Sequence, residues 1–114
     1  MLIYKVMTVA EHQSFSATGV FEGSADDRRD GFIHLSAGQQ LAGTLAKHFA
    51  GQGPLRLLAC EADALGEALK WEISRGGKAF PHLYRPLTAA DVLWDRPLPP
   101  DAEGAHPLPA DLEL

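Results

Sequence analysis

The apolar residues of this chain fall mostly in short runs of strand length, separated by glycine, proline and charged residues. The run 55–60 (LRLLAC) is nearly continuous in apolar residues, which is typical of a central strand. The β-branched and aromatic residues of 2–7 and the alternation of 69–73 predict two further strands, and a last one is expected at 92–94. Because the predicted strands outnumber the helices, we expect an α+β fold with a mixed, mainly antiparallel sheet.

Two helices are predicted from their N-terminal signals. Thr8 precedes Glu11 by three residues, which is the spacing of a capping box, and the helix would run over about 9–17. Ser36 begins a second such spacing. The helix after it would bury one apolar stripe, made of Leu41, Leu45 and Phe49. The polar stretch 23–30 between the two helices is predicted to be an exposed loop.

The charge of the chain is unevenly distributed. The formal net charge is −5, but residues 1–85 carry nine acidic and nine basic side chains. The excess lies in residues 86–114, where six acidic side chains accompany only one basic residue, Arg96. A general nucleic-acid binder needs a basic surface that displaces counterions from phosphates. The composition offers no such surface, so we expect no general binding to nucleic acid.

The composition changes at Pro97. Five prolines and few large apolar residues predict an extended acidic tail over 97–114 that supplies little core, after one globular domain over 1–96. No apolar run approaches the roughly 18 residues of a membrane span, and the first residues lack the pattern of a secretory signal. The single cysteine, Cys60, excludes an internal disulfide and a cysteine-rich zinc site. These features predict a soluble, cytoplasmic protein without a membrane partner, and they leave the oligomeric state open.

Two short clusters carry the residues best suited to chemistry. In 30–36 (DGFIHLS) the period of a strand places His34 and Ser36 on one face, and in 80–84 (FPHLY) it does the same for His82 and Tyr84. The free N–H groups of a helix that begins at Ser36 would favour an anion such as phosphate. Two imidazoles and a phenol from one small sheet could thus converge on a polar pocket. The proline in the second cluster predicts an edge strand or an extended loop.

Each of these residues also has a purely structural interpretation. His34 could satisfy backbone groups in the core, and the Ser36 hydroxyl could act only as a helix cap. Glu72 could lie on a solvated strand face, and Lys5 could be the charge of an edge strand. Cys60 is more typical of an inert core thiol than of a nucleophile, because its strand is the most apolar one.

A combination of segments along residues 2 to about 95 resembles one known family. The segments are Ile3–Val6, Asp30–Ser36, Gln40, Thr44, Trp71–Glu72 and Phe80–Tyr84. Together they resemble a bacterial domain-of-unknown-function family, number 952. The chain departs from the family pattern at Arg85, where a glycine is usual, and in its long proline-rich tail.

The resemblance implies a fold like that of the ADP-ribosyltransferases, a split mixed sheet with flanking helices around a cleft for NAD. Within that superfamily, the His-Leu-Ser element at 34–36 is most similar to the RNA 2′-phosphotransferases, which use NAD. Their first strand has a His-Gly pair after a tyrosine, whereas this chain has Lys5 after Tyr4. Glu72 is a candidate for the catalytic glutamate of this superfamily by its chemistry alone.

The leading hypothesis is a polar pocket that binds a nucleotide, a phosphate ester or an NAD-like ligand. ADP-ribosyl or phosphoryl transfer would be the reaction of a catalytic site. The candidate catalytic residues are His34, His82 and Glu72, and the candidate ligand-binding residues are Tyr4, Lys5, Ser36, Gln40 and Tyr84. One alternative is a non-catalytic interaction module that keeps the fold without cofactor chemistry. Another is a metal site of His34, His82 and an acidic residue, although no paired-ligand spacing supports it.

Overall fold

The computed structural model describes residues 1–112 and residue 114. The elements in chain order are β1 (Leu2–Thr8), α1 (Val9–Thr18), β2 (Val20–Phe21), α2 (Ala25–Asp30), β3 (Ile33–His34), β4 (Ser36–Ala37), η1 (Gly38–Gln40), α3 (Leu41–His48), β5 (Leu55–Glu61), η2 (Ala62–Ala68), β6 (Leu69–Ile73), η3 (Arg75–Gly77), β7 (Ala79–Leu83), β8 (Leu87–Thr88), η4 (Ala89–Asp91) and β9 (Val92–Leu98). Elements labelled η are short 3₁₀ helices. No helix in this described part of the chain is long and apolar enough to cross a membrane.

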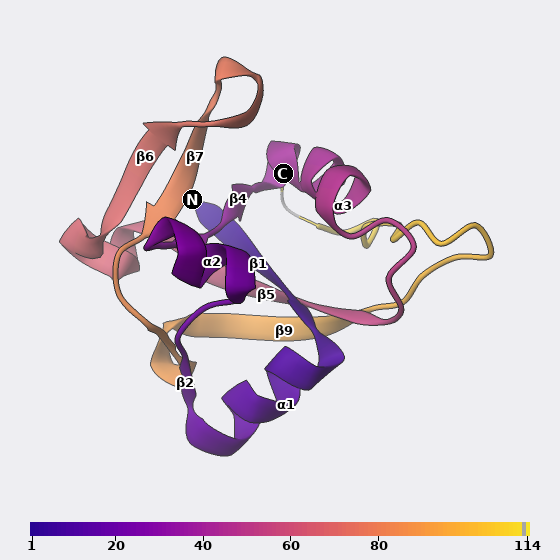
Figure 1. Ribbon diagram of the computed structural model, residues 1–114, viewed down its shortest axis with the longest axis horizontal. Helices are drawn as coiled ribbons and strands as arrows, with labels where there is room; N and C mark the ends of the chain where they lie inside the picture. The colour runs from indigo at the N-terminus through magenta and orange to yellow at the C-terminus, as the bar shows by residue number, and fades with distance from the viewer. Residues whose placement is uncertain (113) are drawn as a thin grey trace.

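The strands form two main sheets and one short ribbon, all with antiparallel pairing. One sheet has the order β4-β1-β5-β9, the other has the order β3-β7-β6, and β2 pairs with β8. In Figure 1 the long strands β1, β5 and β9 lie together, and the β6–β7 hairpin projects away from them. The predicted α+β class with mainly antiparallel sheets is confirmed.

The two central strands of the four-stranded sheet, β1 and β5, are buried on both faces. Along β1, Ile3 and Met7 pack in a cluster with Phe15 of α1, and the alternate residues Tyr4 and Val6 pack in a second cluster with α3. A strand that is buried on both faces has few polar positions. This explains why β5, at the centre of the sheet, reads as a nearly continuous apolar run.

The first helix begins and ends as its sequence predicts. The Thr8 hydroxyl accepts a hydrogen bond from the Glu11 N–H at 3.1 Å, and the Glu11 carboxylate accepts from the Thr8 N–H at 2.9 Å. At the other end Gly19 has a φ of 75°, and its N–H donates to the Phe15 carbonyl at 2.7 Å. Glycine adopts this left-handed backbone conformation without the steric cost of a Cβ.

The stretch 23–30 was predicted to be an exposed loop, and that prediction is wrong. Residues 25–30 form α2, and a capping box made by Ser24 and Asp27 begins the helix. Asp27 is buried. The helix has no apolar stripe. The polar contacts of Asp27 with Lys5 and His34 hold it against the rest of the protein. It ends at Gly31, where φ is 86°.

Ser36 does not cap a helix, contrary to the sequence prediction. It lies in β4 opposite Tyr4 of β1, and its hydroxyl is 2.9 Å from the Thr44 hydroxyl. The Gln40 side chain instead accepts the Ala37 N–H at 2.9 Å, and α3 begins only after it. The pairing with β1 therefore carries Ser36 into the sheet and moves the helix start downstream.

Pro81 lies in a central strand rather than at an edge. β7 is paired on both sides, by β3 and by β6. The Pro81 carbonyl accepts from the Leu35 N–H at 3.0 Å on the β3 side. The nitrogen of the same residue points to that side as well, beyond the end of the two-residue strand β3, so the sheet tolerates the absent N–H.

The segment after Pro97 contributes more to the core than its composition predicts. β9 continues to Leu98, which is 1% exposed, and Leu108 and Leu112 pack against the cluster on the α3 face. His106 is also buried, with its Nε2 2.9 Å from the Gly53 carbonyl. Apolar residues spaced between prolines are thus sufficient to hold this segment against the body.

Candidate functional site

The candidate site is organised around Asp27, whose side chain is 2% exposed. Its Oδ2 accepts hydrogen bonds from the Lys5 ammonium and from the Ser24 N–H, both at 2.9 Å. Its Oδ1 accepts the His34 backbone N–H at 3.0 Å. Burial alone would raise the pKa of Asp27, but the His34 hydrogen bond and the Lys5 charge hold that pKa well below its ordinary value. Asp27 is therefore a buried, ionised carboxylate.

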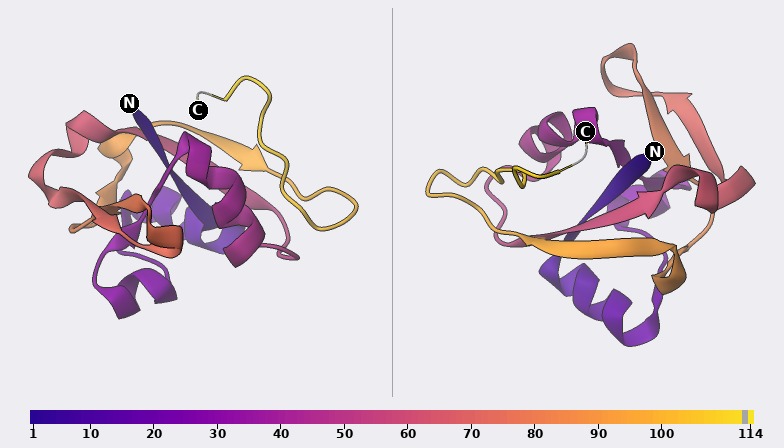
Figure 2. Two further views of the ribbon diagram at one scale, coloured as in Figure 1. Left: turned by 90° about the horizontal axis from the view of Figure 1, so that it is seen from above. Right: turned by 180° about the vertical axis from the view of Figure 1, so that it is seen from behind.

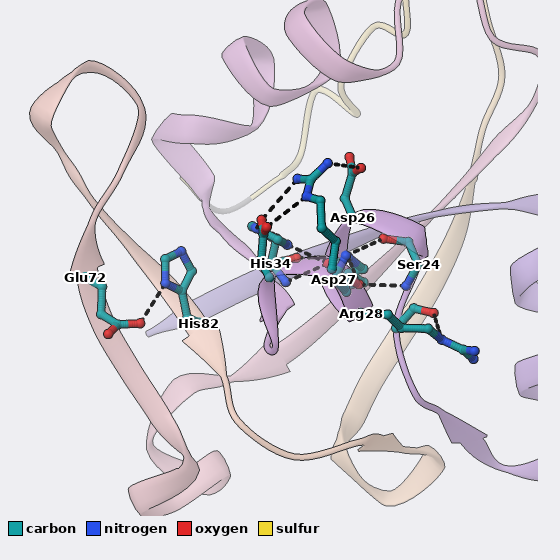
Figure 3. Close-up of polar contacts among 11 residues, drawn as sticks. Ser24, Asp26, Asp27, Arg28, His34, Glu72 and His82 are labelled. Atoms are coloured by element: carbon teal, nitrogen blue, oxygen red, sulfur yellow. Dashed lines mark hydrogen bonds and ion pairs between the residues drawn. The ribbon is translucent and has the colours of Figure 1, made fainter.

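His34 is held by carboxylates at both ring nitrogens. Its Nδ1 is 2.6 Å from Asp27 Oδ1 (Figure 3). Its Nε2 is 3.0 Å from Asp30 Oδ2. Lys5 adds a hydrogen bond to the His34 carbonyl at 3.0 Å. The imidazole nevertheless remains 35% exposed. A histidine that is oriented from behind by a buried carboxylate and open to solvent in front is a usual arrangement for ligand binding or proton transfer.

A second polar network joins Glu72 of β6 to the end of β7. Its Oε1 is 2.9 Å from His82 Nδ1 and accepts the Tyr84 hydroxyl at 2.6 Å. The Tyr84 and His82 hydrogen bonds lower the pKa of Glu72, and the same Glu72 contact raises the pKa of Tyr84. His82 is buried, and Phe32 stacks on its ring with 4.0 Å between centroids.

The two histidines are neighbours but belong to separate networks. They are paired residues of β3 and β7, and their ring centroids are 5.6 Å apart. Phe32 contacts both rings. Figure 3 shows the Glu72–His82 contact apart from the contacts around Asp27, with no hydrogen bond drawn between the two groups.

A pocket of about 360 Å³ opens in front of His34. Besides His34 and Lys5, its lining includes Lys47 and His48 at the end of α3 and Arg75 of η3. Burial and the nearby charges of Arg75 and Lys47 lower the pKa of His48. Lysine and arginine side chains from four elements, β1, α2, α3 and η3, therefore share this pocket.

His34 and Lys5 are the predicted site residues in its lining; His82 and Glu72 are outside it. Tyr84 lines a different pocket, of about 330 Å³, on the other side of α2. Lys5 is not an edge charge, because β1 is a central strand and its ammonium is buried against Asp27.

Three other predicted ligand-binding residues, Tyr4, Gln40 and Ser36, lie outside the pocket in front of His34. Tyr4 is buried in the core, 5.9 Å from Trp94 between ring centroids. The Gln40 amide bridges the backbone, donating to the Ala79 carbonyl at 2.8 Å and accepting the Ala37 N–H. Ser36 is bonded to Thr44 and is not among the residues that line the pocket.

Comparison with known families and structures agrees with the resemblance in the sequence. Residues 6–95 match the family described as "Protein of unknown function (DUF952)". The chain belongs to this family. The crystal structure of protein CC0527 from Caulobacter crescentus is 56% identical to it, with a TM-score of 0.90 and 94% of both chains covered. The solution NMR structure of CC0527 is 58% identical, with a TM-score of 0.82, covering 91% of this chain and 90% of that one.

Both CC0527 structures come from structural genomics, and among curated proteins none matches this DUF952 chain. Within the described residues, no group of three or more His, Cys, Asp or Glu side chains is arranged to hold a metal ion.

The predicted site residues do not include Asp27, which orients His34 in this DUF952 protein, or Lys47 and Arg75, which line the same pocket. Asp27 had one local signal, because it follows Ser24 by three residues and precedes Gly31, the pattern of a short capped helix. Lys47 and Arg75 had no such signal. Their place beside His34 depends on how α3 and the β6–β7 hairpin pack, which no local pattern reports.

Proposed function

We propose that this DUF952 chain binds a small phosphate-bearing ligand in the pocket in front of His34. The observation that carries the proposal is the geometry of His34, which is fixed by the buried Asp27 and 35% exposed toward a pocket that also contains Lys47 and Arg75. Charge-assisted hydrogen bonds from such groups are the strongest that a protein offers to a phosphate oxygen.

The charges of the pocket favour an anion. Two of its acidic residues, Asp26 and Asp30, are already paired with Arg29, at 3.1 and 2.9 Å. Among the described residues neither Lys47 nor Arg75 forms an ion pair with a carboxylate. The positive charge of α3 and η3 is therefore available to a ligand, and a ligand oxygen could replace Asp30 at His34 Nε2.

The volume favours a ligand of modest size. Binding pockets for small molecules commonly range from about 300 to 1,000 Å³, and a pocket of about 360 Å³ is near the lower end. A phosphate ester or a mononucleotide suits this volume better than the whole of NAD. A relationship to the ADP-ribosyltransferases would then concern the fold. NAD or ADP-ribose would occupy the pocket with only one phosphate-bearing half of the ligand.

The proposal is for binding, because two of the three candidate catalytic residues, His82 and Glu72, lie outside the pocket. Glu72 and His82 are hydrogen-bonded to each other, and Tyr84 adds a second bond to the same Glu72 oxygen. For ADP-ribosyl or phosphoryl transfer, one of them would have to leave this network and reach the pocket. This observation favours the interaction module as the second candidate function.

The test is a thermal-shift and calorimetric series with inorganic phosphate, AMP, ADP-ribose and NAD. A ligand at 100 times its dissociation constant adds about 2.7 kcal/mol to the unfolding free energy, which raises Tm by roughly 10 °C for a domain of this size. Lys47→Ala should weaken binding about tenfold or more. Lys78→Ala, which removes an exposed lysine outside the pocket lining, is the matched control and should bind normally.

Two results would contradict the proposal. One is that none of the four compounds raises Tm. The other is that Lys47→Ala and Lys78→Ala bind the active compound with equal affinity, which would place its site elsewhere.

A further inference from the structure

The β6 strand is the open edge of the three-stranded sheet. It follows β7 at the end of the order β3-β7-β6, and the views in Figures 1 and 2 agree that it forms the outer side of the projecting hairpin. Trp71 is 42% exposed and Ile73 is 72% exposed on this strand. Natural proteins usually protect such an edge, since its unpaired backbone groups can pair with another chain.

The hydrogen-bonding direction of this edge follows from Pro81. Pro81 is the register partner of Trp71, and its carbonyl accepts from Leu35 on the side away from β6. Trp71 and Pro81 are therefore a pair without mutual hydrogen bonds, so the Trp71 N–H and C=O point outward. By alternation, the backbone groups of Ile73 and the carbonyl of Leu69 also face the open edge, whereas the Leu69 N–H donates to the Gly66 carbonyl. The Tyr84 N–H, which donates to the Ala68 carbonyl at 2.8 Å, fits the same alternation.

The sequence of β6 is complementary to itself in one antiparallel register. With Trp71 opposite Trp71 of a second copy, Lys70 of each copy lies opposite Glu72 of the other, and Leu69 lies opposite Ile73. Opposite charges directly across a strand pair are stabilising, and like charges are destabilising. A shift to the next allowed register, in either direction, places Lys70 against Lys70 or Glu72 against Glu72. The charges thus specify a single register.

We propose that a second copy of this chain pairs antiparallel along β6, with Trp71 on the two-fold axis. The outward groups of Trp71 and Ile73 and the Leu69 carbonyl would exchange about four backbone hydrogen bonds. The two sheets would become one continuous sheet across the axis. An isologous contact of this kind closes on itself, so it produces a dimer and not a filament.

The side chains on the two faces of β6 support the same pairing. Lys70 and Glu72 share one face, and they form the pairs without mutual hydrogen bonds, in which facing side chains approach most closely. Glu72 uses only Oε1 for His82 and Tyr84, so its Oε2 is free to accept the second copy's Lys70. Trp71 and Ile73 lie on the opposite face and would cover each other across the axis. The contact spans five residues of each copy, less than a standard interface, so the dimer depends on concentration.

The decisive experiment is sedimentation equilibrium on the full chain from micromolar to millimolar concentration. The wild type should rise from 12.3 kDa toward twice that mass. Lys70→Glu places like charges across the axis and should weaken the dimer at least tenfold. The double variant Lys70→Glu/Glu72→Lys restores opposite charges and should dimerise like the wild type. Lys78→Glu makes the same charge change in the same hairpin, away from the edge, and should have no effect.

A wild type that stays monomeric throughout this range would overturn the proposal. A dimer that Lys70→Glu leaves intact would also overturn it, because the contact would then lie elsewhere. Amide hydrogen exchange gives an answer without any variant. The amides of Trp71 and Ile73 should exchange more slowly as the wild-type concentration rises, and an unchanged rate would contradict the pairing. Neither readout depends on a ligand, so the result is independent of the proposed function.

Discussion

Replacing Asp27 by asparagine tests the polar centre of the protein with almost no change in volume. The variant keeps Lys5 charged and buried but removes its partner, whose oxygen is 2.9 Å away. Breaking a buried ion pair from one side costs about 3–5 kcal/mol, because the remaining charge is left uncompensated. The new amide also places an NH₂ group among the N–H donors of Ser24 and His34. We expect Asp27→Asn to lower the free energy of unfolding by that amount at pH 7, as measured by urea denaturation.

The difference between the wild type and Asp27→Asn should depend on pH in a defined direction. The pKa of Asp27 is lower in the folded protein than its ordinary value of 3.8: burial opposes the ionised form, but the His34 hydrogen bond and the Lys5 charge outweigh it. A carboxyl group with a depressed folded-state pKa stabilises the fold above its unfolded-state pKa and loses this contribution as the pH falls. The difference in unfolding free energy between the wild type and Asp27→Asn should therefore be largest above about pH 5. It should shrink by about 1.4 kcal/mol for each pH unit below 3.8.

Asp26→Asn is the matched control, since Asp26 is the preceding residue of the same helix and its side chain is 62% exposed. Its pair with the exposed Arg29 should contribute less than about 1 kcal/mol. Similar stability of the two variants at pH 7 would contradict this prediction. An effect of Asp27→Asn that grows, rather than shrinks, between pH 5 and pH 3 would contradict it as well.

Three further predictions concern the core and the backbone. Leu98→Ala should lower the free energy of unfolding by about 2–5 kcal/mol in urea denaturation, because Leu98 is 1% exposed; a loss below 1 kcal/mol would mean that the C-terminal segment does not hold the α3 face. Cys60 should react with a thiol reagent only after unfolding, since it is fully buried and burial raises the pKa of its thiol to about 12; fast labelling of the native protein would disprove this. Gln40→Ala leaves the Ala37 N–H and the Ala79 carbonyl without their partner and should cost about 1–3 kcal/mol, while calorimetry should find an unchanged affinity for phosphate compounds.

The strands and the first helix could be predicted because their signals are local. The apolar run of β5, the alternation of β6 and the capping box at Thr8 each lie within a few residues of the element that they specify. The position of β7 could not be read in this way. Pro81 predicts an edge strand or an extended loop, yet β7 lies between β3 and β6. The strand tolerates the proline because β3 ends before the position at which the missing N–H would pair.

The polar site could be predicted only in part, because most of its contacts join residues from different elements. The sequence identified His34 and His82, and the register of β3 and β7 does place them side by side. Their separate carboxylate partners could not be foreseen. Asp27 reaches His34 only because α2 folds over the end of β3, and Lys5 reaches Asp27 across 22 residues of chain. Contacts between elements of this kind depend on packing, and one sequence carries no periodic signal for them.

An NMR titration of the isotopically labelled full chain with AMP and with inorganic phosphate tests the ligand pocket most directly. We expect saturable shifts that are largest for the imidazoles of His34 and His48 and for the Arg75 guanidinium, all of which line the pocket. Lys47→Ala should reduce these shifts at equal ligand concentration. Shifts that fail to saturate, or that are confined to residues outside this pocket, would contradict ligand binding in front of His34.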